Sequence, residues 1–135
     1  MFNFFVFDTS VLISAAIRKD SIARKAFDHA LTKGTIVRSA ETFAEFASRI
    51  VRPKFDKYLM PQEKLFTVAH FKSGSIQVDV PFSVKACRDP NDDMFLSLSV
   101  AVDAACIVTR DLDLLELHPF RGIPIITPSD FLKKF

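Results

Sequence analysis

The sequence is poor in several residue types that mark particular protein classes. Among its 135 residues there is no tryptophan, one tyrosine, three glycines and two cysteines. So few glycines leave no GxGxxG fingerprint and no phosphate-binding P-loop, which argues against a nucleotide-binding fold. The cysteines, Cys87 and Cys106, lie in apolar segments without CxxC spacing. We therefore expect buried free thiols in a reducing compartment rather than a disulfide framework.

Long apolar runs are missing as well. No stretch approaches the roughly 18 apolar residues of a membrane helix, and the best candidate, 95–108, is interrupted by Asp103. The N-terminus lacks the basic residues of a signal peptide and reaches Asp8 too early to form one. The sequence thus predicts a cytoplasmic protein without a membrane segment. A net charge of +2 is too small to indicate nucleic-acid binding by itself.

Apolar residues are plentiful even though long apolar runs are absent. They make up 49% of the chain against 25% charged residues, which is typical of a globular protein, and the length fits one domain over 1–135. Fifteen phenylalanines predict a dense aromatic core. They are also compatible with a second apolar surface that binds a partner, such as another copy of the chain.

Short apolar runs alternate with capped amphipathic segments along the chain. We predict strands at 4–7, 35–38, 76–80, 105–109 and 123–127. Helices are expected at 11–17, 21–31, 39–52, 61–71 and 92–102, with a helical turn after Asp111 and a terminal helix from Pro128. This alternation predicts an α/β fold in three α/β/α layers, with a mainly parallel sheet between helices.

Three aspartates stand at the predicted carboxyl ends of strands, where ligands bind in such folds. Asp8 and Asp111 each follow a strand closely, and Asp92 lies in the first turn of a helix that follows a loop on the same side. Converging carboxylates repel one another unless a cation lies between them. Hard oxygen ligands of this kind suit Mg²⁺ or Mn²⁺ and an in-line phosphodiester displacement.

Each aspartate taken alone also has an ordinary structural explanation. Asp8 could be only an N-cap, Asp92 a favourable charge at a helix start, and Asp111 the cap of a turn. Helix geometry distinguishes Asp92 from its neighbour Asp93. At about 100° per residue, Asp92 lies near the apolar face of its helix, whereas Asp93 falls on the opposite side and should face solvent. Asp92 is therefore the better candidate ligand.

Other charged residues near these segments have less specific patterns. Glu41 and Glu45 both fall opposite the apolar stripe of their helix, so periodicity predicts a solvated face for both. Asp113 is interpreted as a surface carboxylate or as a group that supports the metal ligands. The basic cluster Arg49, Arg52, Lys54 and Lys57 would attract an RNA backbone, or it is simply a solvated face.

Four blocks of sequence resemble the motifs of PIN domains, in the same order. Residues 8–15 resemble the opening motif, usually written with Asp-Thr-Asn, and 39–55 resemble the second block. Residues 87–96 and 107–115 resemble the third and fourth. The resemblance covers nearly the whole chain and is strongest to single-domain PIN proteins that form the toxin component of VapBC-like toxin–antitoxin systems.

The resemblance implies a PIN-like fold and a Mg²⁺- or Mn²⁺-dependent endoribonuclease that cleaves single-stranded RNA. It implies an acidic site at Asp8, Glu45, Asp92 and Asp111, and it is the only reason to prefer Glu45 over Glu41. Relatives commonly form homodimers and bind an antitoxin that covers the active site. We therefore expect both kinds of partner here.

Supporting roles fall to Ser10, Thr109, Asp93 and Asp113. Ser10 stands where the family usually has Asn, and it could still hold Asp8 or a water. The family's hydroxyl position matches Thr109, which could orient a water or Asp111. Arg110 stands where Gly is common, and it would bind phosphate or crowd the site. With Arg49, Arg52 and Lys54, it completes the set of expected RNA contacts.

Rival enzyme classes lack required residues. A haloacid-dehalogenase phosphatase needs an Asp at the position of Ser10, and a receiver domain needs an acidic pair after the first strand. His29, His70 and His118 show no metal or triad spacing and are expected to be structural. The remaining alternative is a PIN fold that binds RNA or a protein without cutting, which the changes at Ser10 and Arg110 keep open.

Overall fold

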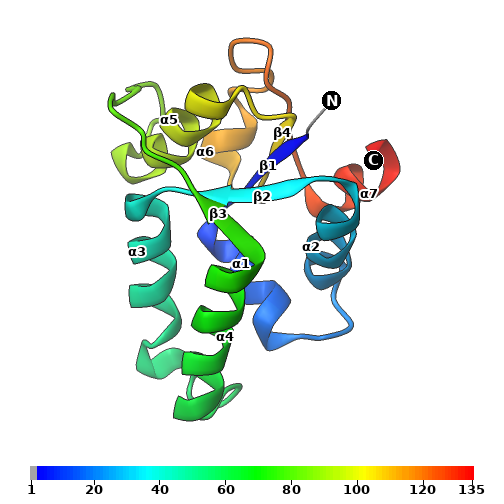
Figure 1. Ribbon diagram of the computed structural model, residues 1–135, viewed down its shortest axis with the longest axis vertical. Coiled ribbons are helices and arrows are strands. Elements are labelled where there is room, and N and C mark those ends of the chain that lie inside the picture. Colours follow the sequence, from blue (N-terminus) through cyan, green and yellow to red (C-terminus); the bar gives the residue numbers. More distant parts are fainter. Residues whose placement is uncertain (1–2) are drawn as a thin grey trace.

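A parallel sheet forms the centre of the molecule. The structure, a computed structural model, describes residues 3–135. Within these residues, five strands pair in the order β3-β2-β1-β4-β5, all parallel (Figure 1). They are β1 (Phe4–Phe7), β2 (Thr35–Arg38), β3 (Ser75–Gln77), β4 (Cys106–Val108) and β5 (Ile125–Ile126). The predicted α/β class is confirmed.

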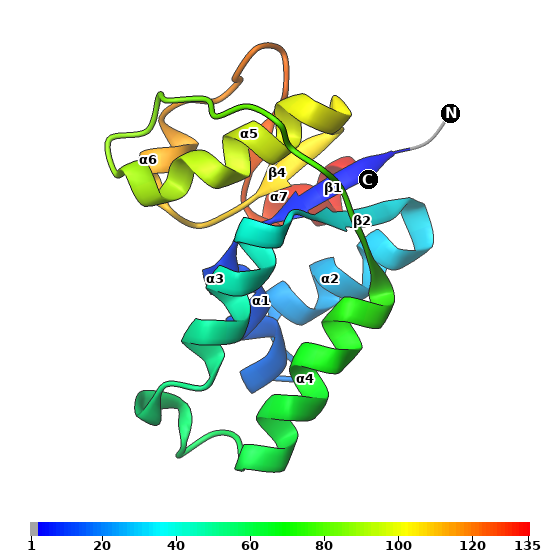
Figure 2. The ribbon, with the colours of Figure 1, turned by 60° about the vertical axis from the view of Figure 1, so that its left-hand side comes forward.

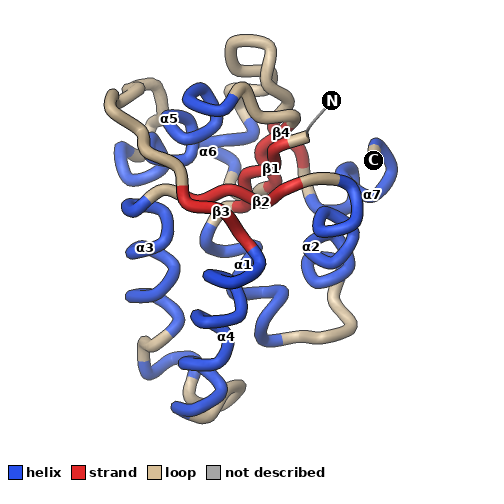
Figure 3. The backbone as a smooth tube through the Cα atoms, viewed as in Figure 1, coloured by secondary structure: helices blue, strands red, loops and turns tan. Residues whose placement is uncertain are grey.

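Helices cover both faces of the sheet, as Figures 1 and 3 show. One face carries α1 (Thr9–Ile17), α2 (Ile22–Lys33), α3 (Ala40–Ile50), α4 (Pro61–Gly74) and α7 (Pro128–Lys134). The other face carries α5 (Asp93–Val102) and the short α6 (Leu112–Leu115). Two 3-10 turns, η1 (Pro53–Phe55) and η2 (Pro90–Asp92), follow α3 and precede α5. Figure 2 shows the long loop after β3 running along α5.

Strand alternation sends different side chains to the two faces. Phe5 and Phe7 of β1 enter an aromatic cluster with Phe27, Phe46 and Phe131, and the rings of Phe5 and Phe131 meet edge to face at 5.1 Å. Val6, between them, enters the opposite cluster, which is mostly aliphatic. Because successive residues of a strand point to opposite faces, the phenylalanines gather on one side. The expected dense aromatic core is confirmed on that side.

Several element boundaries differ from those predicted. The strand predicted at 76–80 is β3, Ser75–Gln77, and α4 runs to Gly74 rather than Phe71. β3 is an edge strand whose only strand partner is β2, and β2 ends at Arg38, opposite Gln77. Beyond that point the backbone has no neighbouring strand to pair with. The strands predicted at 105–109 and 123–127 shorten to β4 and β5.

The two cysteines differ in their burial. Both cysteines are free, and Cys106 is buried, but Cys87 is only half-buried in the loop before η2, so the expectation of burial is wrong there. Burial, with the aspartates Asp93, Asp92 and Asp111 nearby, raises the pKa of the Cys87 thiol to about 12. No helix among the described residues is both long and apolar enough to cross a membrane.

Candidate active site

Strand order brings Asp8 beside Thr109. β1 and β4 are parallel neighbours with Phe7 opposite Val108, so the residues that follow them emerge together. Asp8 is 3% exposed and caps α1, with its Oδ1 accepting from the Val11 N–H at 2.9 Å. Its Oδ2 accepts a hydrogen bond from the buried Thr109 hydroxyl. The Asp111 N–H donates to the same hydroxyl oxygen at 2.9 Å, so Thr109 links the two aspartates.

Three carboxylates converge next to this pair. One oxygen from each of Asp92, Asp111 and Asp113 lies within 4.8 Å of the others. Asp111 caps α6, with its Oδ1 accepting from the Asp113 N–H at 2.9 Å, and this cap folds Asp113 back over Asp111. Asp92 begins α5 but makes no side-chain cap bond. Its Oδ2 is buried and has no hydrogen-bond partner among residues 3–135.

This crowding makes the anionic site unfavourable without a counterion. Burial, opposed by the Thr109 and Val11 bonds, raises the pKa of Asp8 to about 6. Burial and the adjacent Asp111 raise the pKa of Asp92 to about 7, with smaller contributions from Asp89 and Asp8. Carboxylates that disfavour ionisation together are stabilised by a cation between them. The site therefore favours cation binding near neutral pH.

Glu45 is linked to the carboxylate cluster by an ion pair with Arg49, whose charge acts on Asp8. The half-buried Glu45 accepts from Arg49 at 3.2 Å, one turn further along α3. The Arg49 charge lies close enough to Asp8 to lower its pKa, against the larger effect of burial. The Arg49 Nε is buried without a hydrogen-bond partner among the described residues. The structure thus brings Glu45 and Arg49 to the edge of the acidic group, whereas Glu41 lies exposed at the start of α3.

Asp93 does not face solvent, so that prediction is wrong. It is 9% exposed, and its Oδ1 accepts from the N–H groups of Ala86 and Cys87 at 3.0 and 2.8 Å. Burial opposes ionisation, but these two donors lower the pKa of Asp93. Helix periodicity predicted solvent because it describes only the helix, whereas the loop before η2 folds over this side of α5. Asp93 therefore holds a loop in place, while Asp92 belongs to the cluster of carboxylates with Asp111 and Asp113.

The remaining predicted residues lie at the periphery. Ser10 is exposed in the first turn of α1, and within the described chain the partners of the Asp8 carboxylate are Val11 and Thr109. Arg52, Lys54 and Arg110 are exposed. His118 accepts from the Ile125 N–H at 2.8 Å, which fits the structural role expected for it.

The donor set fits a divalent cation of the kind that Mg²⁺ and Mn²⁺ represent. Asp92, Asp111 and Asp113 offer only carboxylate oxygens, which hard cations prefer. The orphaned Oδ2 of Asp92 is the atom that most needs a partner, because a buried acceptor without one is costly. The sequence predicted that Asp113 is a surface carboxylate or a group that supports the metal ligands. Its position two residues after a capping aspartate is the signal that favours a place among the ligands themselves.

Known proteins resemble this chain in sequence and in fold. Residues 5–113 match the family model described as PIN domain. The chain is 26% identical over 140 residues to the uncharacterized protein MJ1680 of Methanocaldococcus jannaschii, covering 96% of this chain and 90% of that protein. The fold of the present chain is similar to that of a chain in the crystal structure of VapBC2 from Rickettsia felis bound to a DNA fragment from their promoter. The TM-score is 0.62 and the sequence identity is 13%. That match covers 90% of this chain and 96% of the other. Since the family model spans most of the sequence, the chain belongs to the PIN domain family.

Proposed function

We propose that this protein is a metal-dependent endoribonuclease that cleaves phosphodiester bonds in single-stranded RNA. PIN domains are generally nucleases, so membership of the family supports nuclease chemistry. The observation that carries the proposal is the convergence of Asp92, Asp111 and Asp113 within 4.8 Å. Beside them lies Asp8, whose pKa burial raises to about 6, so a nearby cation would stabilise its ionised form.

The carboxylates have distinct parts in this proposal. Asp92, Asp111 and Asp113, with Asp8 beside them, would hold Mg²⁺ or Mn²⁺. A bound ion would supply Lewis-acid chemistry that activates water and stabilises the leaving oxygen. Thr109 fixes the orientation of Asp8 and Asp111 through its single hydroxyl. Glu45 would join the metal-binding carboxylates once RNA or the ion separates Arg49 from it.

Exposed basic residues, one next to Asp111 in the chain and two after the end of α3, support a nucleic-acid substrate. Arg110 is exposed directly beside Asp111, and Arg52 and Lys54 are exposed beyond the end of α3. Exposed cations bind phosphate without reading sequence. The Lys54 ammonium lies over the half-buried Phe55 ring, 5.1 Å from its centre, and Lys54 itself is exposed at η1. These groups would hold the strand while the carboxylates act on one phosphate.

Cleavage of a labelled single-stranded RNA in Mn²⁺, in Mg²⁺ and in EDTA tests the proposal. We expect cleavage with either ion and none in EDTA. Asp111→Asn should lower the rate by about 100-fold or more, because even outer partners of a metal site cost about 10–100-fold when lost. Asp103→Asn is the matched control, since Asp103 is an exposed aspartate at the far end of α5, with a positive φ of 50° that Asn tolerates.

The outcome also decides the rival function. Cleavage that survives Asp111→Asn, or no cleavage by folded wild-type protein in Mn²⁺, would contradict the nuclease proposal. RNA binding without cleavage would instead favour the non-catalytic PIN module. Equal cleavage of single-stranded DNA would remove the preference for RNA.

We further propose that the nuclease is the toxin of a type II toxin–antitoxin pair. The similar fold from Rickettsia felis belongs to a VapBC2 structure. Here a groove of about 540 Å³ lies between α1, α2 and α4, with Phe27, Phe46 and Leu59 in its lining. Phe66, 71% exposed on α4, lines the same groove. A groove with an apolar floor and the exposed Phe66 ring at its side suits an apolar segment of an antitoxin.

Co-expression with the product of a neighbouring small open reading frame tests this role. We expect the chain alone to arrest growth, the pair to grow and co-purify, and Phe66→Asp to abolish co-purification while cleavage persists. Light scattering of the chain alone tests the expected homodimer. Growth that is unaffected by active enzyme would contradict the toxin role and leave the nuclease proposal intact.

A further inference from the structure

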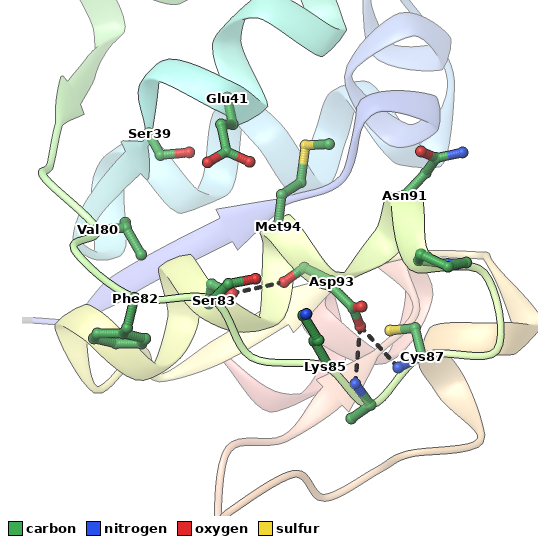
Figure 4. Close-up of a pocket in the computed structure, with 13 residues that line it drawn as sticks. Ser39, Glu41, Val80, Phe82, Ser83, Lys85, Cys87, Asn91, Asp93 and Met94 are labelled. Carbon is green, nitrogen blue, oxygen red and sulfur yellow. Dashed lines mark hydrogen bonds between the residues drawn. The ribbon is translucent and has the colours of Figure 1, made fainter.

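A second cavity lies on the side of the sheet that carries α5, and its lining includes Asn91 and Asp93, the chain neighbours of Asp92. It has a volume of about 730 Å³, within the usual range for small-ligand sites. Figure 4 shows its walls: the start of α3, the loop between β3 and η2, and the start of α5. Ser39 and Glu41 come from α3, Phe82 and Lys85 from the loop, and Met94 from α5.

The loop wall of this cavity is fixed by hydrogen bonds to α5. The Val84 N–H donates to the Ser97 hydroxyl at 2.8 Å, and Val84 itself is buried in the aliphatic core. Asp93 accepts from the Ala86 and Cys87 amides further along the loop. A loop tied at three successive points holds its side chains in place without a ligand. The cavity is therefore a built site and not a gap under a loose segment.

The lining combines an exposed aromatic ring with two exposed, oppositely charged side chains. Phe82 is 45% exposed at one side of the cavity. Figure 4 shows Glu41 extending from α3 toward the loop and Lys85 extending from the loop toward α3. In the part of the chain that the structure describes, neither Glu41 nor Lys85 takes part in an ion pair. The Lys85 charge lies close enough to Asp93, also in the lining, to help lower the pKa of that carboxyl. An aromatic ring, a carboxylate and an ammonium exposed at one cavity suit a flat, polar ligand that carries a negative charge.

One end of the cavity is lined by residues close to Asp92, a member of the carboxylate cluster. Asn91 and Asp93 line the cavity, and they flank Asp92 in the chain. The Cys87 side chain, also in the lining, is close enough to Asp92 and Asp111 for their charges to raise its pKa. A nucleotide bound in the cavity would thus be joined to a phosphate near Asp92. This adjacency ties the cavity to the cleavage chemistry proposed above.

We propose that this cavity is a nucleobase subsite that receives one unpaired base next to the phosphate to be cleaved. The assignment rests on the proposed nuclease function and adds a base-binding position to it. Unpaired bases stack on aromatic side chains, and Phe82 offers the ring. Lys85 binds the phosphate of that nucleotide, and Glu41 contacts the edge of its base.

Glu41 makes the subsite selective for guanine. An ionised carboxylate only accepts hydrogen bonds, and it has two oxygens. Guanine presents two adjacent donors on its Watson–Crick edge, N1–H and N2–H₂, so it can engage both oxygens at once. Uracil presents one donor between two carbonyl acceptors, which a carboxylate repels. The subsite therefore prefers guanosine over uridine at this position.

Binding of short fluorescent oligouridines, with or without one central guanosine, tests the subsite in EDTA. We expect the guanosine to tighten wild-type binding about tenfold, and Glu41→Gln to remove that difference. Phe82→Ala should weaken binding of both oligonucleotides about tenfold, as the loss of one base stack does, and Phe82→Trp should restore it. Phe66→Ala and Asp20→Asn are matched controls, since both residues are exposed and lie outside the cavity.

Cleavage in Mn²⁺ is measured on the same proteins, so that the two proposals can fail separately. Guanosine preference in binding without cleavage by the wild type would sink the nuclease proposal and keep the subsite. Cleavage with unchanged binding and unchanged cut positions in Phe82→Ala and Glu41→Gln would overturn the subsite alone. A loss in Phe82→Ala that Phe82→Trp does not restore would also count against it, because a loop defect would then explain the loss.

Discussion

The two faces of the sheet are built from different residues and serve different ends. One face is covered by five helices and contains the aromatic cluster with Phe5, Phe27, Phe46 and Phe131. The other is covered by α5, α6 and the loop before η2, and its buried residues are aliphatic apart from Phe95. Asp92 and Asp111 stand at the starts of the helices on this second, thinner face.

The difference teaches how stability and chemistry can be separated in a small domain. The aromatic face provides packing area, about 150–250 Å² for each buried ring. The thinner face places helix starts, a loop and polar groups at the sheet edge, where they meet Asp8 from β1. Damage to the first face should therefore reduce stability, and damage to the second should change ion binding and loop position.

The largest stability effect is expected from Phe131→Ala on the aromatic face. Phe131 is fully buried, and its ring lies 5.1 Å from that of Phe5 and 5.9 Å from that of Phe7. Removing such a ring costs about 3–5 kcal/mol. Urea unfolding measures the loss, with the exposed Phe66→Ala as control, expected within about 0.5 kcal/mol of wild type. A cost below that of the control would refute the assignment of stability to this face.

The contribution of Asp8 and Asp92 to folding stability should change with pH in the opposite sense from that of an ordinary ion-paired carboxylate. The folded-state pKa of Asp8 is raised to about 6, and that of Asp92 to about 7, from the ordinary 3.8. Raised values mean that the folded state holds protons that the unfolded state has released. The metal-free protein should therefore lose stability as pH rises from about 4 to 7. For the buried Asp8, two pKa units correspond to at most about 3 kcal/mol.

Thermal unfolding in EDTA across this pH window measures the effect. Asp92→Asn should unfold at a higher temperature than wild type at pH 7.5, and the difference should shrink toward pH 4.5. Adding Mn²⁺ should raise the wild-type midpoint and leave Asp92→Asn nearly unchanged. Parallel curves for the two proteins, with or without the ion, would show that Asp92 takes no part in the charged group.

Sequence patterns predicted the elements of this fold better than the contacts made between them. Hydrophobic period and capping residues are local, so the strands, their order in the chain and the sites of Asp8 and Asp111 could be predicted. The short extent of β3 could not, because it depends on where β2 ends. For Asp113 the sequence predicted at most a supporting role, because its grouping with Asp92 depends on the turn at Asp111. Glu45 could be chosen over Glu41 only from the family resemblance, because both residues lie opposite the apolar stripe of their helix.

Asp93 gives the smallest expected effect and the sharpest contrast with its neighbour. The Ala86 and Cys87 amides both donate to one oxygen of Asp93, so Asp93→Asn can keep an acceptor there, whereas Asp93→Ala leaves these two amides without one. We expect Asp93→Ala to cost about 1–3 kcal/mol and Asp93→Asn clearly less, by urea unfolding. Asp92→Asn, one residue away, should cost nothing in metal-free protein at neutral pH, because it removes repulsion. If Asp92→Asn proved the more destabilising of the two asparagine variants, the assignment of ion binding to Asp92 and loop fixation to Asp93 would have to be reversed.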